Sequence, residues 1–387
     1  EQKQTRLTDT RADETNPRFS ADDEHVIFRR DNNLFSLTLT TGLVRQITDL
    51  RPGPEPDEPE PSPREQFLEN QQTTLFETLR KQKEEKAAAE THQKTDRQAD
   101  DPPSTVYTGD KRVDQLRLDP TGRYATFALR SEPDAAEPTI VADYVTLDGT
   151  AEALEARPKV GIPPEDFSLH VQNLKQDTTI EVNLHQLPGA YDVPDYRQEK
   201  GVELDSSEAK RALYSYGPYW SPNGEHAVLV VRSDNNKDRW IVRLNPESGT
   251  LTVLDRQHDD AWISGPGIGS YGGAGTVGWI PDPRSGSGAG SDNFYFQSEE
   301  TGWSHLYTVN VGTGETQQLT SGAFEVYDPR LSKDGSTWIF ASSAHSPHER
   351  HLYRMPVNGG KMTQLTSREG THHAAVSPNG ERLGILY

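Results

Sequence analysis

The sequence has 387 residues, of which 32% are hydrophobic, and its mean hydropathy of −0.83 is low for a globular chain. Its 60 acidic residues outnumber 40 basic ones, and the net charge of −20 argues against a nucleic-acid or anionic-membrane partner. The absence of cysteine excludes disulfides, thiolate zinc sites and a cysteine nucleophile, and no apolar run approaches the ~18 residues that cross a bilayer.

The first predicted elements are short strands on either side of a turn at residues 20–24. Related turns, in which Ser or Asp stands with Pro, Asn or Gly between apolar residues, follow at residues 119–122, 221–224, 332–335 and 377–380. Five copies indicate a repeat of antiparallel strands. Residues 5–8 match the Leu-Thr phrase that closes later repeats, so we expect the chain to begin in the middle of a repeat.

Residues 51–104 interrupt this repeat. They begin with an acidic, proline-rich tract typical of an extended linker. From residue 64 to about 99 the pattern becomes helical, with Leu68, Leu75 and Leu79 on one side. We predict a helical insertion that leaves the repeat between two strands and folds back against it or against a partner. A solvated helix without a role is the alternative.

Residues 105–205 are the least regular part, and the regular strand pattern returns from Ala209 onward. Between residues 279 and 366 the same order of strands and turns occurs twice, and Thr320 and Thr366 close the two copies 46 residues apart. This period fits a four-stranded propeller blade. The last strand, residues 382–387, stops inside a blade.

These patterns predict an all-β fold: a β-propeller of the seven- or eight-bladed type, with four-stranded blades and a helical insertion. We expect residues 1–387 to form one propeller segment that starts and ends mid-blade, with the linker and helical insertion at residues 51–104 inside it.

Two patterns that suggest ligand sites lack the context they need. Residues 267–272 match a dinucleotide-binding fingerprint by letter, but a strand rather than a helix follows them. His345, His348 and His351 recur every third residue, but they fall in an interstrand loop whose geometry the sequence does not fix. We therefore expect no cofactor and no metal site.

The pair Glu299 and Glu300 is open to two interpretations. The two carboxylates suit an amine or an arginine as a ligand, but they also fit a polar hairpin turn beside Gly302, which we favour. No Gly-x-Ser-x-Gly and no other nucleophile–base pattern is present, so we expect no catalytic residue in this chain.

Residues 294–307 and 319–326 closely resemble the propeller of dipeptidyl peptidase IV-like enzymes, which belong to the prolyl oligopeptidase family of serine peptidases. The shared phrase is an aromatic strand, Glu-Glu-x-Gly-aromatic-x-His, a further strand, and an aromatic-Glu-Val. Residues 219–224 also look like the family's Trp-Trp-Ser-Pro-Asn-Gly phrase. The resemblance is strong from about residue 210 to 387 and weak over residues 1–205, and it does not include the insertion.

The resemblance implies a bacterial parent in which the propeller caps a C-terminal α/β-hydrolase with a Ser-Asp-His triad, beyond Tyr387. The propeller would gate and recognise peptide substrates, and this chain alone would be inactive, so its own status as an enzyme is left open. The alternative is a stand-alone periplasmic propeller used as a protein-binding scaffold. The Glu-Glu-x-Gly-Trp-x-His and Phe-Glu-Val phrases favour the peptidase, because a scaffold does not need them.

The resemblance also implies a substrate site. Family dipeptidyl peptidases hold the substrate's α-amino group with two adjacent glutamates about ten residues before the Trp-Ser-Pro-Asn-Gly turn. Here only Glu208 is acidic, and Lys210 would repel an ammonium. In this respect the chain departs from the pattern that strict dipeptidyl exopeptidase specificity requires. The candidate substrate-binding residues are Glu208, Tyr216, Glu299 and Glu300. The implied partners are a peptide, the parent's own hydrolase domain and, in the full-length protein, a second copy. We expect a periplasmic or secreted parent and leave a cytoplasmic one open.

Overall fold

The computed structural model describes residues 6–56, 62, 64–68, 71, 81–82, 85, 103–131, 137–156, 164–193, 210–269, 273–281, 290–377 and 382–387. The chain divides into two compact units. The first contains Glu1–Leu129 and His170–Glu181, and the second contains Arg130–Leu169 and Val182–Tyr387. No described helix is long and apolar enough to cross a membrane.

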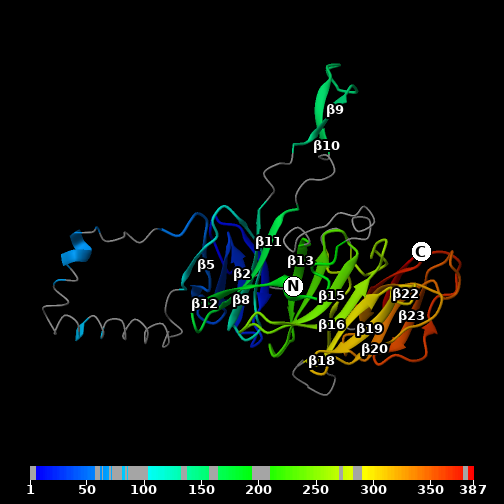
Figure 1. Ribbon diagram of the computed structural model, residues 1–387. Coiled ribbons are helices and arrows are strands. Elements are labelled where there is room, and N and C mark those ends of the chain that lie inside the picture. Colours follow the sequence, from blue (N-terminus) through cyan, green and yellow to red (C-terminus); the bar gives the residue numbers. More distant parts are fainter. Residues whose placement is uncertain are drawn as a thin grey trace. The chain divides into compact units, whose positions relative to one another are not determined.

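The first unit opens with a four-stranded antiparallel sheet in sequential order. Its strands are β1 (Glu14–Phe19), β2 (His25–Arg30), β3 (Asn33–Thr38) and β4 (Val44–Gln46). They are drawn in blue in Figure 1, where β2 is labelled. Buried Ile27, Phe28, Leu34 and Leu37 supply its apolar residues. Sequential antiparallel order follows from the short turns between the strands, because a tight turn allows only neighbouring antiparallel pairing.

The two ends of the insertion lie side by side. Strand β5 (Asp49–Arg51) pairs in parallel with β6 (Thr105–Tyr107), and a bridge joins Gly53 to Gly109. The chain therefore leaves the fold and returns to it at neighbouring points, so the insertion does not shift the pairing of the strands around it. Residues 64–68 are helical, and their start is capped by reciprocal bonds in which Glu65 N–H donates to Ser62 Oγ and Ser62 N–H to the Glu65 carboxylate. The predicted apolar positions at Leu75 and Leu79 lie outside the described residues.

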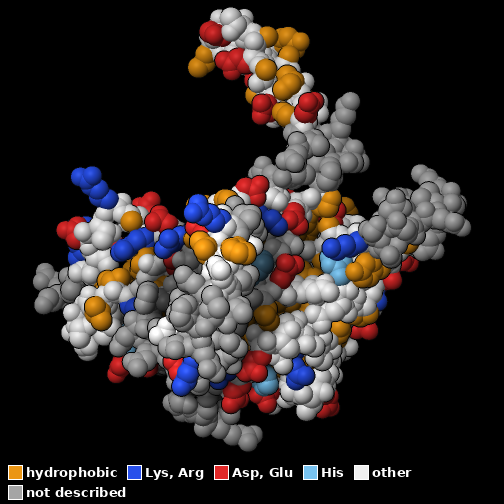
Figure 2. Space-filling model, turned by 60° about the vertical axis from the view of Figure 1, so that its left-hand side comes forward, with side chains coloured by type: hydrophobic (Ala, Val, Ile, Leu, Met, Phe, Trp, Pro, Cys, Tyr) orange, Lys and Arg blue, Asp and Glu red, His pale blue; other side chains and the backbone are white. Residues whose placement is uncertain are grey.

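A further four-stranded sheet has the order β12-β11-β8-β7. Its strands are β7 (Arg112–Leu118), β8 (Tyr124–Ser131), β11 (Asp166–Asn173) and β12 (Thr178–Val182). Between β8 and β11 the chain forms the hairpin β9 (Thr139–Asp143) and β10 (Glu152–Ala156), which pair with each other. The hairpin exposes apolar side chains, and residues 137–156 carry acidic but no basic residues. Figure 2 shows these orange and red side chains together at the top of the view.

The second unit contains three regular four-stranded sheets of sequential order, followed by a two-stranded one. The first is formed by β13 (Leu213–Trp220), β14 (Ala227–Ser233), β15 (Asp238–Leu244) and β16 (Leu251–His258). The next two are β17 (Gly278–Pro281), β18 (Gly290–Ser298), β19 (His305–Asn310) and β20 (Thr316–Gln318), then β21 (Val326–Leu331), β22 (Thr337–Ser342), β23 (His351–Pro356) and β24 (Thr363–Gln364). Strands β25 (His373–Val376) and β26 (Leu383–Leu386) form the last pair, and the 3₁₀ turn η1 (Leu184–Gln186) precedes the first sheet.

Repeated four-stranded sheets of this kind are propeller blades, so the all-β propeller class is confirmed. The number of blades in the whole protein stays a prediction.

Neighbouring blades of the second unit pack face to face through alternating side chains. Phe294 and Phe296 join a cluster with Val228, Val230 and other residues of the preceding blade. Tyr295, between them in sequence, packs instead into the cluster around Trp338 of the following blade. Because successive side chains of a strand point to opposite faces, one strand thus serves both interfaces.

A His–Thr hydrogen bond closes two of these blades. In one, His305 Nδ1 lies 3.0 Å from Thr320 Oγ1, which also accepts from Leu306 N–H. The next blade repeats this arrangement with His351, Thr366 and Leu352, at the same spacing of 15 residues. We call this pairing of the first residue of the third strand with a threonine after the fourth the blade clamp. In the first blade of the chain, Asn33 and Thr48 occupy the same positions.

Candidate functional site

Glu299 and Glu300 lie in the turn between β18 and β19, as the preferred interpretation of the sequence expected. Gly302 N–H donates to the carbonyl of Glu299 at 2.8 Å, and Gly302 adopts φ +88°, a conformation that glycine reaches without strain. Glu300 N–H donates to Ser298 Oγ at 3.2 Å. The turn thus directs the two carboxylates differently: Glu299 is half-buried and Glu300 is exposed.

Glu299 is directed at the segment that follows β16. Burial raises the pKa of its carboxyl group, while hydrogen bonds from the main-chain N–H groups of Ser264 and Gly265 act in the opposite direction. Negative charge on Glu325 and Asp259 raises the pKa further. A Cβ atom on Gly265 would lie 1.9 Å from Glu299 Oε1, so the close approach depends on glycine at this position.

The two phrases that carry the family resemblance contact each other in space. Glu325 accepts a hydrogen bond from Ser304 N–H at 2.6 Å, and Val326 N–H donates to the Ser304 carbonyl at 2.9 Å. Gln297 Nε2 donates to the Val326 carbonyl at 2.8 Å. The Glu-Glu-x-Gly-Trp-x-His turn of one blade is therefore joined to the Phe-Glu-Val start of the next, which gives both phrases a structural role.

Two buried arginines hold the segment that Glu299 faces. Arg232 donates to the carbonyls of Ile263, Ile268 and Gly269 at 2.6–3.1 Å. Arg239 donates to the carbonyl of Ala274 at 2.8 Å. These bonds fix residues 263–269 and Ala274 against the blade, because each of the bonded carbonyls gains a charged donor where water is excluded. We call residues 263–275, in their described part, the anchored loop.

The electrostatics around Arg239 are unusual because its guanidinium is fully buried and binds neutral acceptors. Burial and the neighbouring charge of Arg232 lower the pKa of Arg239 to about 9. Asp255 is close enough to attract it, but burial raises the pKa of Asp255. Gln257 links the two, since its Oε1 accepts from Arg239 and its Nε2 donates to Asp255.

The structure places the four predicted site residues differently. Tyr216 lies on β13, packs against the core shared with β18 and β19, and is close enough to Arg232 to act on its pKa. Glu299 lies at the anchored loop, beside Ser264 and Gly265. Glu300 is exposed, and Glu208 lies outside the described residues.

Sequence reasoning missed the anchoring residues Arg232, Arg239, Gln297 and Glu325. A signal existed for the two arginines, since each adjoins the continuous apolar run of a buried strand. A charge in such a run is expected to have buried partners. The partners themselves come from a distant loop, which no local pattern indicates.

Comparison with known proteins agrees with the sequence resemblance. Residues 134–386 match the family model described as the dipeptidyl peptidase IV (DPP IV) N-terminal region. A protein named probable dipeptidyl peptidase 4, from Aspergillus fumigatus, is 26% identical over 208 residues, which is 52% of this chain and 24% of the relative. A probable dipeptidyl-aminopeptidase B from Emericella nidulans is 26% identical over 224 residues, or 57% of this chain and 22% of the relative.

Solved structures show the same fold. The crystal structure of Porphyromonas gingivalis dipeptidyl peptidase 4 is similar with a TM-score of 0.54 and 17% identity, over 98% of this chain and 43% of that one. The matched part of this chain spans about a quarter of the length of the curated relatives, and less than half of this solved chain.

Proposed function

Because this chain belongs to the family of dipeptidyl peptidase IV N-terminal regions, we propose that it is the substrate-gating and recognition propeller of a dipeptidyl peptidase IV-like serine peptidase. The observation that carries the proposal is the family match over residues 134–386. The relatives extend far beyond the part matched here, which leaves ample length for a catalytic domain. Proteolysis would be carried by a C-terminal α/β-hydrolase outside this chain.

The rigidity of the blades supports the proposed gating role. Interdigitated aromatic cores and the bonds between Ser304, Glu325 and Val326 join successive blades within the second unit, and blade clamps close two of the individual blades. A wall built this way deforms little, since close-packed interiors resist compression. It would admit short or unfolded peptides to a hydrolase and exclude folded proteins.

The recognition role rests on Glu299. This carboxylate lies at the anchored loop with part of its surface open, and exposed Glu300 follows it. A peptide's free α-ammonium group is the complementary ligand, because a charged donor and a charged acceptor form the stronger hydrogen bonds. The net charge of −20 would favour the approach of such a cation.

The first test uses the full-length gene product. It should hydrolyse dipeptidyl chromogenic substrates and short peptides, lose activity when the nucleophilic serine of its hydrolase is replaced by alanine, and leave folded proteins intact. The isolated chain should show no turnover. A gene that encodes no hydrolase after Tyr387, or a full-length enzyme that degrades folded proteins at a similar rate, would refute the gating role. The first result would favour the stand-alone scaffold.

The second test addresses Glu299 in the full-length enzyme. We expect Glu299→Gln to raise KM for peptides with a free amino terminus about tenfold, which corresponds to one charged hydrogen bond. KM for N-acetylated peptides should not change. Glu315→Gln is the matched control, since Glu315 is exposed in the next hairpin turn of the same blade. Equal effects on free and acetylated peptides would exclude ammonium binding by Glu299.

We also propose that the parent is exported to the periplasm or secreted and forms a homodimer, on the strength of the resemblance alone. Cell fractionation tests the location, and light scattering of the full-length protein tests the oligomeric state. A cytoplasmic monomer would refute both.

A further inference from the structure

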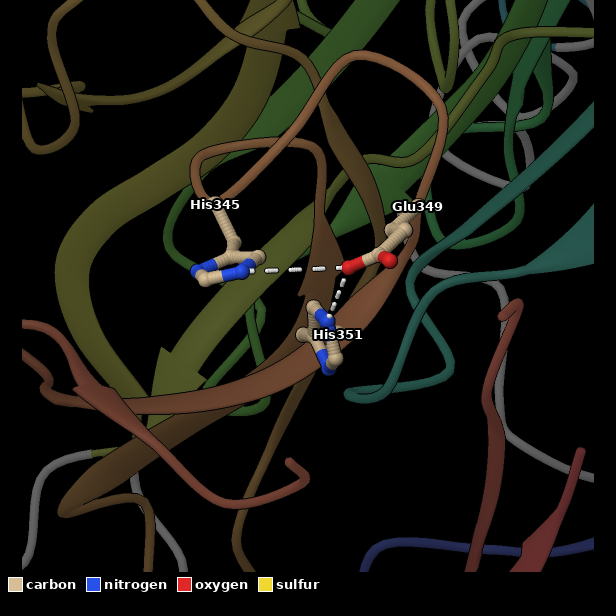
Figure 3. Close-up of side chains that lie close together, drawn as sticks. All are labelled: His345, Glu349 and His351. Atoms are coloured by element: carbon tan, nitrogen blue, oxygen red, sulfur yellow. Dashed lines mark hydrogen bonds and ion pairs between the residues drawn. The ribbon is translucent and has the colours of Figure 1, made fainter. Parts of the chain in front are cut away.

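Two histidines and a glutamate meet where β22 is connected to β23. His345 and Glu349 come from the connecting loop, and His351 is the first residue of β23 (Figure 3). His345 Nε2 lies 3.9 Å from Glu349 Oε2, and His351 Nε2 lies 2.8 Å from the same oxygen. One ligand atom from each residue lies within 4.8 Å of the other two.

The loop is held in the conformation that brings these side chains together. Glu349 N–H donates to the carbonyl of Ser346 at 3.2 Å, which closes a turn, and the side chains of His345 and Glu349 point toward each other from its two ends (Figure 3). Arg350 N–H donates to the Gly370 carbonyl at 3.2 Å. The backbone of Glu349 is thus fixed on both sides.

His351 is fixed more firmly still. It is 1% exposed, and its Nδ1 lies 3.1 Å from Thr366 Oγ1 in the blade clamp. Buried His372 stacks on it at a centroid distance of 5.1 Å, with the Nδ1 of His372 engaged by the Arg350 carbonyl at 3.0 Å. His372 therefore supports the ring of His351, whose Nε2 is directed at Glu349.

The preceding blade shows what the clamp alone requires. His305 occupies the position of His351, and its Nδ1 lies at the same kind of threonine. Its Nε2, however, lies 3.0 Å from the Gly322 carbonyl, a neutral main-chain acceptor. The blade clamp is complete without a carboxylate or a second imidazole, so Glu349 and His345 add something that the clamp does not need.

We propose that His345, Glu349 and His351 bind a divalent transition-metal ion of the zinc class. Two imidazole nitrogens and one carboxylate oxygen form a donor set that zinc prefers, whereas Mg²⁺ and Ca²⁺ prefer oxygen ligands alone. In a tetrahedral site with bonds of about 2.1 Å, ligand atoms lie about 3.4 Å apart. The observed separations of 2.8 and 3.9 Å bracket this value, so small side-chain rotations make the site.

The surrounding groups fit this ligation. With the metal on Nε2, His351 carries its proton on Nδ1 and donates it to Thr366 Oγ1, the supporting bond that metal-bound histidines usually make. His345 is exposed, so the ion reaches the site from solvent, and water fills the fourth position. The bound metal would join the connecting loop to β23 and stabilise the folded chain.

The test is zinc titration of the purified chain after treatment with EDTA, by calorimetry and by thermal unfolding. We expect binding with a Kd in the micromolar range or below, and a rise in the unfolding midpoint of about 5 °C at saturating zinc. Mg²⁺ should give neither. His345→Ala and Glu349→Gln should each weaken zinc binding at least tenfold. Both substitutions change residues at the surface end of the cluster. Without metal, each variant should therefore have the same thermal unfolding midpoint as the wild type.

The matched control is His348→Ala, an exposed histidine of the same loop that is outside the cluster. His226→Ala removes a second, more exposed group of potential ligands formed with Glu225 and Asp292. Both variants should keep the high-affinity site. Zinc affinity that is unchanged in His345→Ala and Glu349→Gln, or equally reduced in His348→Ala, would overturn the proposal.

Discussion

Replacement of Asp238 is the most direct test of the packing of the second unit. Its side chain is 1% exposed and lies 2.6 Å from Arg211, 3.0 Å from Arg256 and 2.9 Å from His258. Arg211 is nearly buried, so its contact resembles a buried charged hydrogen bond and contributes about 2 kcal/mol. Arg256 and His258 are 30% and 48% exposed, which reduces each of their contributions to about 0.5 kcal/mol. Asp238→Asn should therefore destabilise the unit by about 3 kcal/mol.

Tryptophan fluorescence during urea unfolding is the suitable assay. All six tryptophans lie between residues 220 and 338, so their emission reports the second unit alone. Asp260→Asn is the control, because Asp260 also contacts His258 but is 87% exposed, and its replacement should change stability by less than about 0.5 kcal/mol. If the free energy of unfolding of Asp238→Asn lies within about 0.5 kcal/mol of the wild-type value, this network does not stabilise the unit as proposed.

The effect of Asp238→Asn should also depend on pH. Burial acts to raise the pKa of Asp238, but hydrogen bonds from Arg211, His258 and Arg256 outweigh it and lower the pKa. This stabilisation is present above the unfolded aspartate pKa of about 3.9 and is lost as the pH falls through the lower folded value. Bonds to Asp238 and Asp260 overcome the burial of His258 and raise its pKa, so its contribution is present below about 6.5 and is lost as the pH rises through the folded value. The difference between wild type and variant should therefore be largest at about pH 5–6; a difference that grows toward pH 9 would contradict this account.

Three further predictions use the same assay. Phe296→Ala should cost about 3–5 kcal/mol, because the ring is fully buried and stacked on Tyr307, and a loss below about 1 kcal/mol would show that the core collapses around the gap. Gly275→Ala should lower the free energy of unfolding by about 2–4 kcal/mol, since Gly275 has φ +80° and the new Cβ would lie 2.4 Å from the Gly267 carbonyl oxygen. Gly302→Ala should lower it by about 1 kcal/mol, because no atom lies within 4 Å of that Cβ. Equal losses of stability in the two variants would contradict the close approach at Gly275. Glu299→Gln should have a higher urea midpoint of unfolding than the wild type at pH 7 and the same midpoint near pH 4. A carboxyl group whose pKa is raised in the folded state stabilises the fold below the unfolded pKa of about 4.3, and this contribution is lost as the pH rises through the folded pKa. A lower midpoint at pH 7 would show that its bonds to the anchored loop outweigh its burial.

The sequence by itself determined the blades. Alternating apolar residues specify strands with two buried faces, and the repeated turns impose sequential antiparallel pairing, both of which are local effects. Ser221 illustrates this, since its carbonyl accepts from Gly224 N–H and its Oγ from His226 N–H, all within six residues. The hairpin turn at Glu299 and Glu300 was likewise evident, because Gly302 and the flanking strands lie within a few residues of the pair.

Only the tertiary structure decided which polar groups meet. Arg239 finds its acceptor 35 residues away at Ala274, and Glu325 finds Ser304 across the boundary between two blades. The recurrence of histidine at every third residue did not predict which of these side chains lie together. The turn closed at Ser346 brings Glu349 to His345 and His351 and leaves His348 outside the cluster. Such contacts depend on loop conformation and blade packing, in which many distant residues take part, so no short stretch of sequence encodes them.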